Sequence, residues 1–262
     1  MKVTYKNPGF KHSIDSILLF QGDDATPFWS NSLLYFYPNL DKDLMRILPP
    51  EAKEEYLKKE LSLVWRDLLD EINGKVELYN LHFAKYHEQI EDALSDAFEI
   101  DTRSVFNDLV GNISLNPVCP RFLEERYFDI FYKNSERGAL GMSLHEIVHF
   151  IWFHVWNKHF GDSYSEYDTP SLKWILSEMV VESIMDDERL ASINPYYPRE
   201  NGGGCVYGYF QNMIIRENPI LETLRTMYQG RSITDYMELS YQYCLDNEKE
   251  IRQHIIEAEK KY

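Results

Sequence analysis

The feature that most constrains the fold is a strongly apolar stretch with ionisable residues inside it, from Met142 to Lys158. A helix over this stretch would be apolar on nearly every side, because of Leu144, Ile147, Val148, Phe150, Ile151, Trp152, Phe153, Val155 and Trp156. A helix that is apolar all round is a buried helix, since no face of it prefers water. The rest of the chain must therefore surround this helix.

The same stretch contains an HExxH sequence, residues 145–149. On a helix, His145 and His149 lie one turn apart on the same face, so both imidazoles can reach one metal ion. Glu146 lies about 100° round the helix from His145 and can point at the open position of that metal. Zinc held by few protein ligands keeps a water whose pKa falls to about 7, and a nearby carboxylate can take its proton. The pattern predicts one zinc ion per chain, held by His145 and His149, with Glu146 as general base. The alternative is a buried helix whose histidines bond to backbone carbonyls and whose glutamate pairs with an arginine.

The residues that follow His149 exclude one of the two common arrangements for a third ligand. The metzincin class needs a glycine three residues after the second histidine and a third histidine six residues after it. Trp152 and Val155 stand at those positions here, and His154 is one position short and points elsewhere on the helix. We therefore expect the third ligand to come from another segment.

A second helix further along the chain offers that ligand. The stretch Pro170 to Asp186 contains Glu178 and Glu182, an i,i+4 pair on one face among apolar side chains. Such a helix can lie against the first one and aim one carboxylate at the zinc. The other carboxylate then orients a zinc-bound histidine through its free ring nitrogen. Either Glu178 is the ligand with Glu182 behind it, or Glu182 is the ligand with Asp186 behind it.

These two stretches together resemble the gluzincin metallopeptidases, of the thermolysin and minigluzincin type. The segment Trp174 to Glu178 is similar to the family's second motif, in which a tryptophan precedes the glutamate ligand. The resemblance thus favours Glu178 as the ligand, with Glu182 behind it, over the alternative with Glu182 as the ligand. The resemblance covers residues 105–190 and implies a zincin-like fold and a zinc-dependent peptidase that acts on a peptide or protein substrate. This chain departs from the family pattern because Met179 follows the glutamate and because 29 residues separate it from His149. We expect an insertion at Gly161 to Thr169 to account for that separation.

The resemblance implies two further features. In the family, the strand before the HExxH helix is a sheet edge to which an extended peptide adds by main-chain pairing, and Arg126 to Lys133 would be that strand. Zinc peptidases also need a donor for the oxyanion of the tetrahedral intermediate. Tyr207 precedes Gly208 in a segment similar to the one that supplies this tyrosine in gluzincins. Tyr207 is therefore our candidate oxyanion donor.

The remaining pattern predicts an α+β fold that is mostly helical, with a small mixed sheet over the HExxH helix and a helical C-terminal lobe. We expect three regions: residues 1–104, mainly helical; residues 105–170, with the sheet and the HExxH helix; and residues 171–262, with the glutamate helix. Helical spacing and breaker residues predict the elements within them. We expect helices over residues 50–74, 77–98, 142–158 and 171–191, the third of them after a turn at 138–141. We expect strands over 108–116 and 126–133 and a loop over 194–204. The later helices should break at Gly230 and Asn247.

The charge composition of the chain limits the classes of partner that it is expected to bind. The chain has 43 acidic and 27 basic residues and a formal net charge of −16, which argues against binding nucleic acid or docking on anionic lipid. The N-terminal sequence lacks the apolar core of a signal peptide, and the three cysteines form no CxxC pair. We expect a cytoplasmic protein. Two other functions compete with a peptidase: a metal-dependent hydrolase of other amides, and an inactive metal-binding protein that binds a partner.

Overall fold

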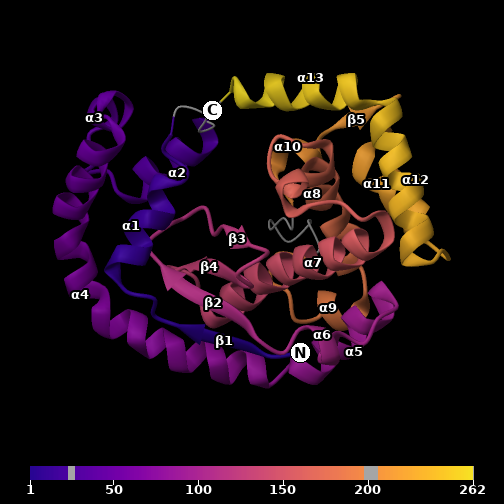
Figure 1. Ribbon diagram of the computed structural model, residues 1–262, viewed down its shortest axis with the longest axis horizontal. Coiled ribbons are helices and arrows are strands. Elements are labelled where there is room, and N and C mark those ends of the chain that lie inside the picture. The colour runs from indigo at the N-terminus through magenta and orange to yellow at the C-terminus, as the bar shows by residue number, and fades with distance from the viewer. Residues whose placement is uncertain (23–26, 198–205, 262) are drawn as a thin grey trace. The chain divides into compact units, whose positions relative to one another are not determined.

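The computed structural model describes residues 1–22, 27–197 and 206–261. These residues form two compact units, each built from separate stretches of the chain (Figure 1). The first unit contains Met1–Lys2, Lys85–Asn107 and Leu140–Lys260, and the second consists mainly of Val3–Ala84 and Asp108–Ala139. The structure is mostly helical with a small mixed sheet, which confirms the predicted α+β class. The units do not follow the three predicted regions, because a strand near the N-terminus pairs with one more than a hundred residues later.

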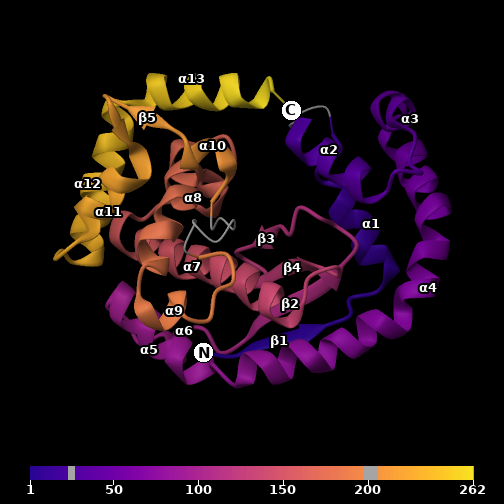
Figure 2. The same ribbon diagram turned by 180° about the vertical axis from the view of Figure 1, so that it is seen from behind.

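The sheet of the second unit has four strands in the order β1-β2-β4-β3 (Figure 2). Strands β1 (Val3–Lys6), β2 (Leu109–Ser114) and β4 (Tyr127–Phe131) run parallel to their neighbours, and β3 (Arg121–Phe122) runs antiparallel to β4. The two predicted strands are confirmed as β2 and β4. Strands β1 and β3 were not predicted, because they have only four and two residues.

The expectation that the strand within 126–133 forms the sheet edge is wrong. Strand β4 lies between β2 and β3, and the segment around β3 takes up its outer side. The backbone N–H of Asp129 donates to the Pro120 carbonyl at 2.8 Å, and that of Phe131 donates to Cys119 Sγ at 3.2 Å. The physical reason is a tight hairpin, because the residues just before β4 fold back along it.

Four helices complete the second unit: α1 (Phe10–Leu18), α2 (Pro27–Phe36), α3 (Lys42–Ile47) and α4 (Pro50–Ala84). The predicted end of a helix at Gly74 is wrong, since α4 continues through it. An internal glycine costs only about 1 kcal/mol, and the burial of Ile72 and Tyr79 on either side outweighs that cost. The Asn80 side chain on α4 binds both the N–H and the carbonyl of Tyr5 at 3.0 Å, so α4 covers the edge that β1 would otherwise expose (Figure 2).

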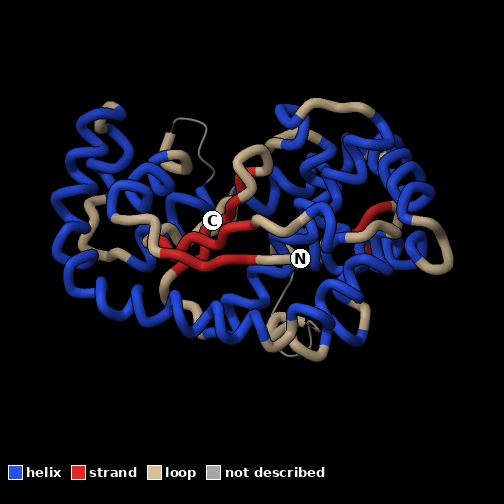
Figure 3. The backbone as a smooth tube through the Cα atoms, turned by 60° about the horizontal axis from the view of Figure 1, so that its bottom comes forward, coloured by secondary structure: helices blue, strands red, loops and turns tan. Residues whose placement is uncertain are grey.

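The first unit is almost entirely helical (Figure 3). Its elements are α5 (His87–Phe98), α6 (Thr102–Val105), most of α7 (Glu136–Phe160), the 3-10 turn Tyr164–Tyr167, α8 (Leu172–Met185), α9 (Glu188–Ala191), α10 (Gly208–Gln211), the hairpin of β5 (Ile214–Ile215) and β6 (Asn218–Pro219), α11 (Ile220–Tyr228), α12 (Ile233–Asp246) and α13 (Glu248–Glu259). The predicted breaks at Gly230 and Asn247 are confirmed. Residues 198–204 of the predicted loop lie outside the described residues.

Two predicted boundaries in this unit are wrong. The residues 138–141 belong to α7 rather than to a turn before it. A Cβ on Gly141 would lie 2.7 Å from both Asn194 Oδ1 and Tyr196 Cδ2, so this glycine lets the loop after α9 pack directly on the helix. The helix predicted for 171–191 ends at Met185, because the Asp187 side chain accepts from Arg189 N at 2.8 Å and starts α9.

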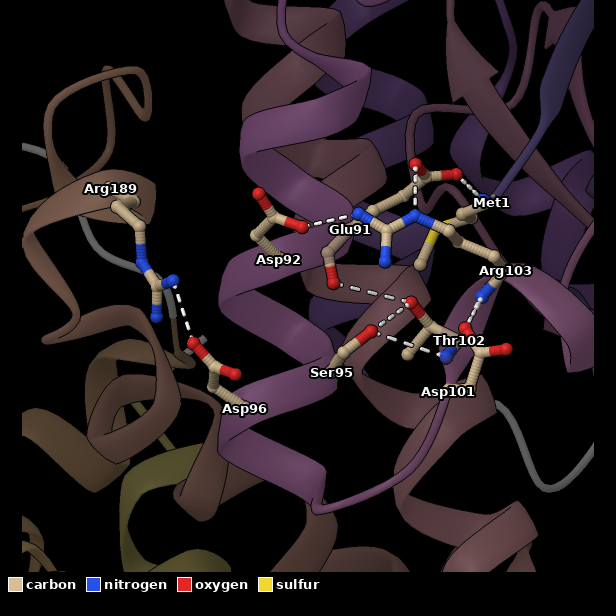
Figure 4. Close-up of polar contacts among 9 residues, drawn as sticks. All are labelled: Met1, Glu91, Asp92, Ser95, Asp96, Asp101, Thr102, Arg103 and Arg189. Carbon is tan, nitrogen blue, oxygen red and sulfur yellow. Dashed lines mark hydrogen bonds and ion pairs between the residues drawn. The ribbon is translucent and has the colours of Figure 1, made fainter.

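Charged contacts on α5 tie together four separate segments of the first unit (Figure 4). The buried Glu91 accepts from the N-terminal amine and lies 3.2 Å from Arg103 Nε, and Arg103 also pairs with Asp92. Further along α5, Asp96 Oδ2 accepts from Arg189 at 2.8 Å, which joins α9 to the same helix. The contact with Arg189 thus holds α9, which follows α8, against α5.

Candidate metal centre

Two buried helices supply the predicted site residues. Helix α7 carries the HExxH sequence, and its apolar residues from Leu144 to Trp156 are buried, as its all-round apolar pattern predicts. Helix α8 is also buried on nearly all sides, and it begins where the Ser171 side chain accepts from Trp174 N at 3.0 Å. The two helices are consecutive in the first unit and are joined by residues 161–171 (Figure 1).

The ring nitrogens of both histidines converge with one glutamate from α8. His145 Nε2 and His149 Nε2 lie 3.0 Å apart. Glu178 presents Oε2 at 3.3 Å from His145 Nε2 and Oε1 at 3.5 Å from His149 Nε2. Two ligand atoms on a tetrahedral zinc ion, with bonds of about 2.0–2.1 Å, lie about 3.3 Å from each other. The observed separations are close to this value, although the two histidines face different oxygens of the Glu178 carboxylate.

Glu146 lies near the same point but further out. One of its carboxylate oxygens and the nitrogens of both histidines are within 4.8 Å of one another, and its Oε1 is 4.0 Å from His145 Nε2. Glu178 approaches this nitrogen more closely than Glu146 does. This difference fits Glu178 as a ligand and Glu146 as a group that acts beside the metal.

Glu182 faces a different partner from the one expected for a ligand. It lies one turn after Glu178 and is 2% exposed, and its Oε1 is 3.5 Å from an Arg225 side-chain nitrogen. Arg225 comes from α11, which packs against α8. The geometry thus favours Glu178 over Glu182 as the third ligand, because the Glu182 carboxylate is compensated by a cation.

Asp186, the residue that directly follows α8, belongs to the same polar cluster. Its Oδ2 is 3.9 Å from Arg225 Nε, and its Oδ1 accepts from the Tyr197 hydroxyl. Burial raises the pKa of Tyr197, and the hydrogen bond to Asp186 raises it further. Burial alone would lower the pKa of Arg225, but the charges of Asp186, Glu222 and Glu182 raise it. Tyr197 and Arg225 therefore both keep their protons and hold this end of α8.

Tyr207 lies close to α8, beside Trp174. It is the residue before α10, and its ring centroid is 6.0 Å from that of Trp174, one turn before Glu178. Its ring also stacks on Tyr209 at 5.2 Å. Its role as an oxyanion donor stays a prediction.

Aromatic rings enclose the buried side of the site. The ring of Phe153 lies parallel to that of His149, with centroids 6.4 Å apart, and both residues are fully buried. Trp152 is also fully buried and contacts Tyr236 edge-on at 6.0 Å. His145 is the most exposed member of the group, at 16%. Access from solvent is therefore on the His145 side.

The donor set fits a borderline-soft divalent cation. Neutral imidazoles and a carboxylate suit zinc and similar transition metals rather than magnesium or calcium, which prefer sets of oxygen ligands. Glu146, Glu178 and Glu182 are all less than 5% exposed, and buried carboxylates are costly unless a positive charge compensates them. Arg225 compensates Glu182, and a dication between the histidines would compensate Glu178.

Comparison of the chain with protein-family models, with curated proteins and with solved structures gives no match. No helix among the described residues is both long enough and apolar enough to cross a bilayer. The interpretation of the site therefore depends on its own geometry.

One charged residue that the structure places beside this site was not predicted from the sequence. Arg225 lies 43 residues after Glu182, in a helix with an ordinary i,i+3 partner, Glu222. Its contact with α8 depends on how α11 packs, which local spacing does not encode. A buried glutamate without a nearby basic residue in sequence was the only available hint that such a cation must exist.

Proposed function

We propose that this protein is a zinc-dependent metallopeptidase of the gluzincin type, with His145, His149 and Glu178 as ligands of one zinc ion. The observation that supports the proposal best is the separation of these three groups, at 3.0, 3.3 and 3.5 Å, from two buried helices. A solvated helix face would not place two histidines and a glutamate around one point. The presence of a second carboxylate, Glu146, at the edge of this set supports hydrolysis rather than a purely structural metal.

The chemistry divides between the ion and the chain. Zinc bound here would polarise a substrate carbonyl and lower the pKa of water to about 7. Glu146 is held on α7 beside the ligands, so its carboxylate takes a proton from the attacking water and passes it to the leaving amine. Glu178 and the two histidines would hold the ion with three protein ligands, the number typical of catalytic zinc sites that also bind a water. The buried aromatic rings keep bulk water from the far side of these groups.

The test combines metal analysis with one substitution. Protein purified without chelator should contain about one zinc per chain, and Glu146→Gln should keep that zinc. The same substitution should lower hydrolysis of a broad peptide library by about 10²–10⁴-fold, the usual contribution of a general base. Glu238→Gln, at an exposed glutamate paired with His159, is the matched control and should have no effect.

Each contrary result rejects a different part of the proposal. Absence of bound zinc would reject the metal centre itself. If the protein contains zinc but neither wild type nor Glu146→Gln hydrolyses peptides, the protein binds a metal and has no peptidase activity. Hydrolysis of non-peptide amides alone, lost in Glu146→Gln, would keep the chemistry and reject the substrate class.

A further inference from the structure

The segment that joins the two ligand helices is held by side chains from both of them. It runs from Gly161 to Pro170 and covers the place where an insertion relative to gluzincins is expected. Its 3-10 turn, Tyr164–Tyr167, is followed by the Ser171 cap of α8, whose hydroxyl also donates to the Glu166 carbonyl at 2.8 Å. The insertion is thus tied directly to the start of the helix that carries Glu178.

One carboxylate in this segment bridges the two helices. Asp162 Oδ2 accepts from Trp156 Nε1 of α7 at 2.7 Å and lies 2.5 Å from Lys173 Nζ of α8. Trp156 is two turns after His149 on the same face, and Lys173 lies little more than one turn before Glu178. Both contacts go to the same oxygen, so this one atom links a side chain of α7 to a side chain of α8.

The contact between Asp162 and Lys173 is an ion pair, because both groups keep their charges. Burial alone would raise the pKa of Asp162, but the hydrogen bonds from Lys173 and Trp156 outweigh it and lower that pKa. Burial likewise lowers the pKa of Lys173, and the bonds to Asp162 and Glu166 more than reverse the effect. Both groups are therefore charged at neutral pH, and they are only 20% and 17% exposed.

The same segment also reaches a metal ligand through stacked rings. Tyr167, which is 1% exposed, stacks on Phe153 with centroids 4.2 Å apart. Phe153 in turn lies parallel to His149. Asn157 of α7 donates to the Tyr167 hydroxyl at 3.3 Å and holds the ring in place. The connecting segment therefore packs behind His149 as well as bridging the helices.

We propose that Asp162 is a positioning residue of the metal centre, which sets the distance between α7 and α8 and so pre-organises Glu178 against the histidine pair. This inference rests on the proposed function, because it concerns the metal that the same residues would hold. Ligands that are already at their bound separations lose less conformational freedom when the ion binds. The connecting segment, where an insertion relative to gluzincins is expected, would thus have a definite task.

The experiment measures metal binding directly. Wild type and Asp162→Asn, stripped of metal, are titrated with Co²⁺ and Zn²⁺ in competition with a chromophoric chelator. We expect Asp162→Asn to weaken both affinities about tenfold, within the 10–100-fold range typical of groups that orient metal ligands. The visible absorption of the Co²⁺ protein should also change, because the ligand geometry loosens, and a loss of stability alone would not alter that spectrum.

The matched control is Glu166→Gln. Glu166 pairs with the same lysine, Lys173, but its carboxylate bridges to no residue of α7 in the described contacts. This variant should keep the wild-type affinity within about twofold. A second variant, Trp156→Phe, removes the indole donor together with part of a buried ring. It should reproduce part of the Asp162→Asn effect on metal affinity and on the Co²⁺ spectrum, which keeps the test decisive if Asp162→Asn fails to fold.

The outcomes separate this inference from the proposed function. Binding by wild type together with unchanged affinity and spectrum in Asp162→Asn and Trp156→Phe overturns the role of Asp162 and leaves the metallopeptidase proposal intact. Equal losses in Glu166→Gln and Asp162→Asn also overturn it, since the effect would then come from Lys173 alone. No Co²⁺ or Zn²⁺ binding by wild type rejects both proposals.

Discussion

Each unit of this protein buries a cluster of histidine and carboxylate groups, and the two clusters are built differently. In the second unit, the fully buried Asp129 of β4 accepts from Ser16 Oγ at 2.6 Å and from His12 Nε2 at 2.8 Å. Donor and acceptor meet directly, and Asn116 donates in turn to Ser16 Oγ at 2.9 Å. In the first unit, two histidine nitrogens and the Glu178 oxygens instead surround one point at separations of 3.0–3.5 Å.

The comparison shows how a structural polar cluster differs from the candidate metal site. Asp129 has proton donors on both of its oxygens, so its burial needs no further group. In the first unit two imidazole nitrogens face each other at 3.0 Å and also face one carboxylate, an arrangement in which a cation between them would be bound by all three groups. Residue types alone do not make this distinction, because both clusters contain histidine and an acidic residue. The arrangement of the ring nitrogens around the carboxylate does.

The largest effect that could break the comparison is expected at Asp129. Asp129→Ala leaves His12 and Ser16 without their buried acceptor and should lower the free energy of unfolding by about 3–5 kcal/mol. Urea unfolding, followed by circular dichroism with and without zinc, measures this. The loss should be the same under both conditions, and a loss that zinc reverses would mean that Asp129 takes part in the metal centre.

The next largest expected effect is on zinc affinity, which should differ between substitutions at Glu178 and Glu182 of α8. Glu178→Ala should weaken zinc binding by more than about a hundredfold, because even groups that only orient ligands contribute about 10–100-fold. Glu182→Ala should keep more zinc than Glu178→Ala, since Glu182 faces Arg225. Isothermal titration of both metal-free variants with zinc checks this, and equal retention would refute the choice of ligand.

The smallest expected effect concerns the Asp129 cluster of the second unit and measures how much one of its hydrogen bonds contributes to stability. Ser16→Ala removes one hydrogen bond to the Asp129 carboxylate and should lower the free energy of unfolding by about 1.5 kcal/mol. His12 keeps its own bond to Asp129 in this variant, so the loss should stay well below that of Asp129→Ala. Chemical denaturation of the two variants side by side gives the ratio, and equal losses would show that the bond from His12 contributes nothing.

The sequence predicted those parts of the molecule in which neighbours along the chain decide the structure. The buried helix with His145 and His149, the strands β2 and β4, and the breaks at Gly230 and Asn247 all follow from local spacing and composition. Strand β1 did not, because four residues with alternating burial carry little signal until β2 is beside them. The end predicted at Gly74 failed because tertiary packing outweighs the small helix penalty of one glycine.

For the candidate site, the sequence supplied the donor types and left the choice between Glu178 and Glu182 open. The structure brings Glu178 to the histidine nitrogens, and the reason is that Arg225 and α11 occupy the side of α8 that Glu182 faces. Asp162 is a similar case, since its bridge between Trp156 and Lys173 depends on a fold of the connecting segment that has no sequence motif. Contacts between helices are the part that spacing within a helix does not predict.

The pairing of Val3 with Leu109 also affects the order in which the chain assembles. Closing a loop of more than a hundred residues costs entropy, and sheets that depend on such distant pairing form slowly. His149 and Glu178, by contrast, are only 29 residues apart. During synthesis, β1 leaves the ribosome long before β2 and must wait for it. In that interval its pairing groups are open to other chains, so co-translational chaperones would matter most for the second unit.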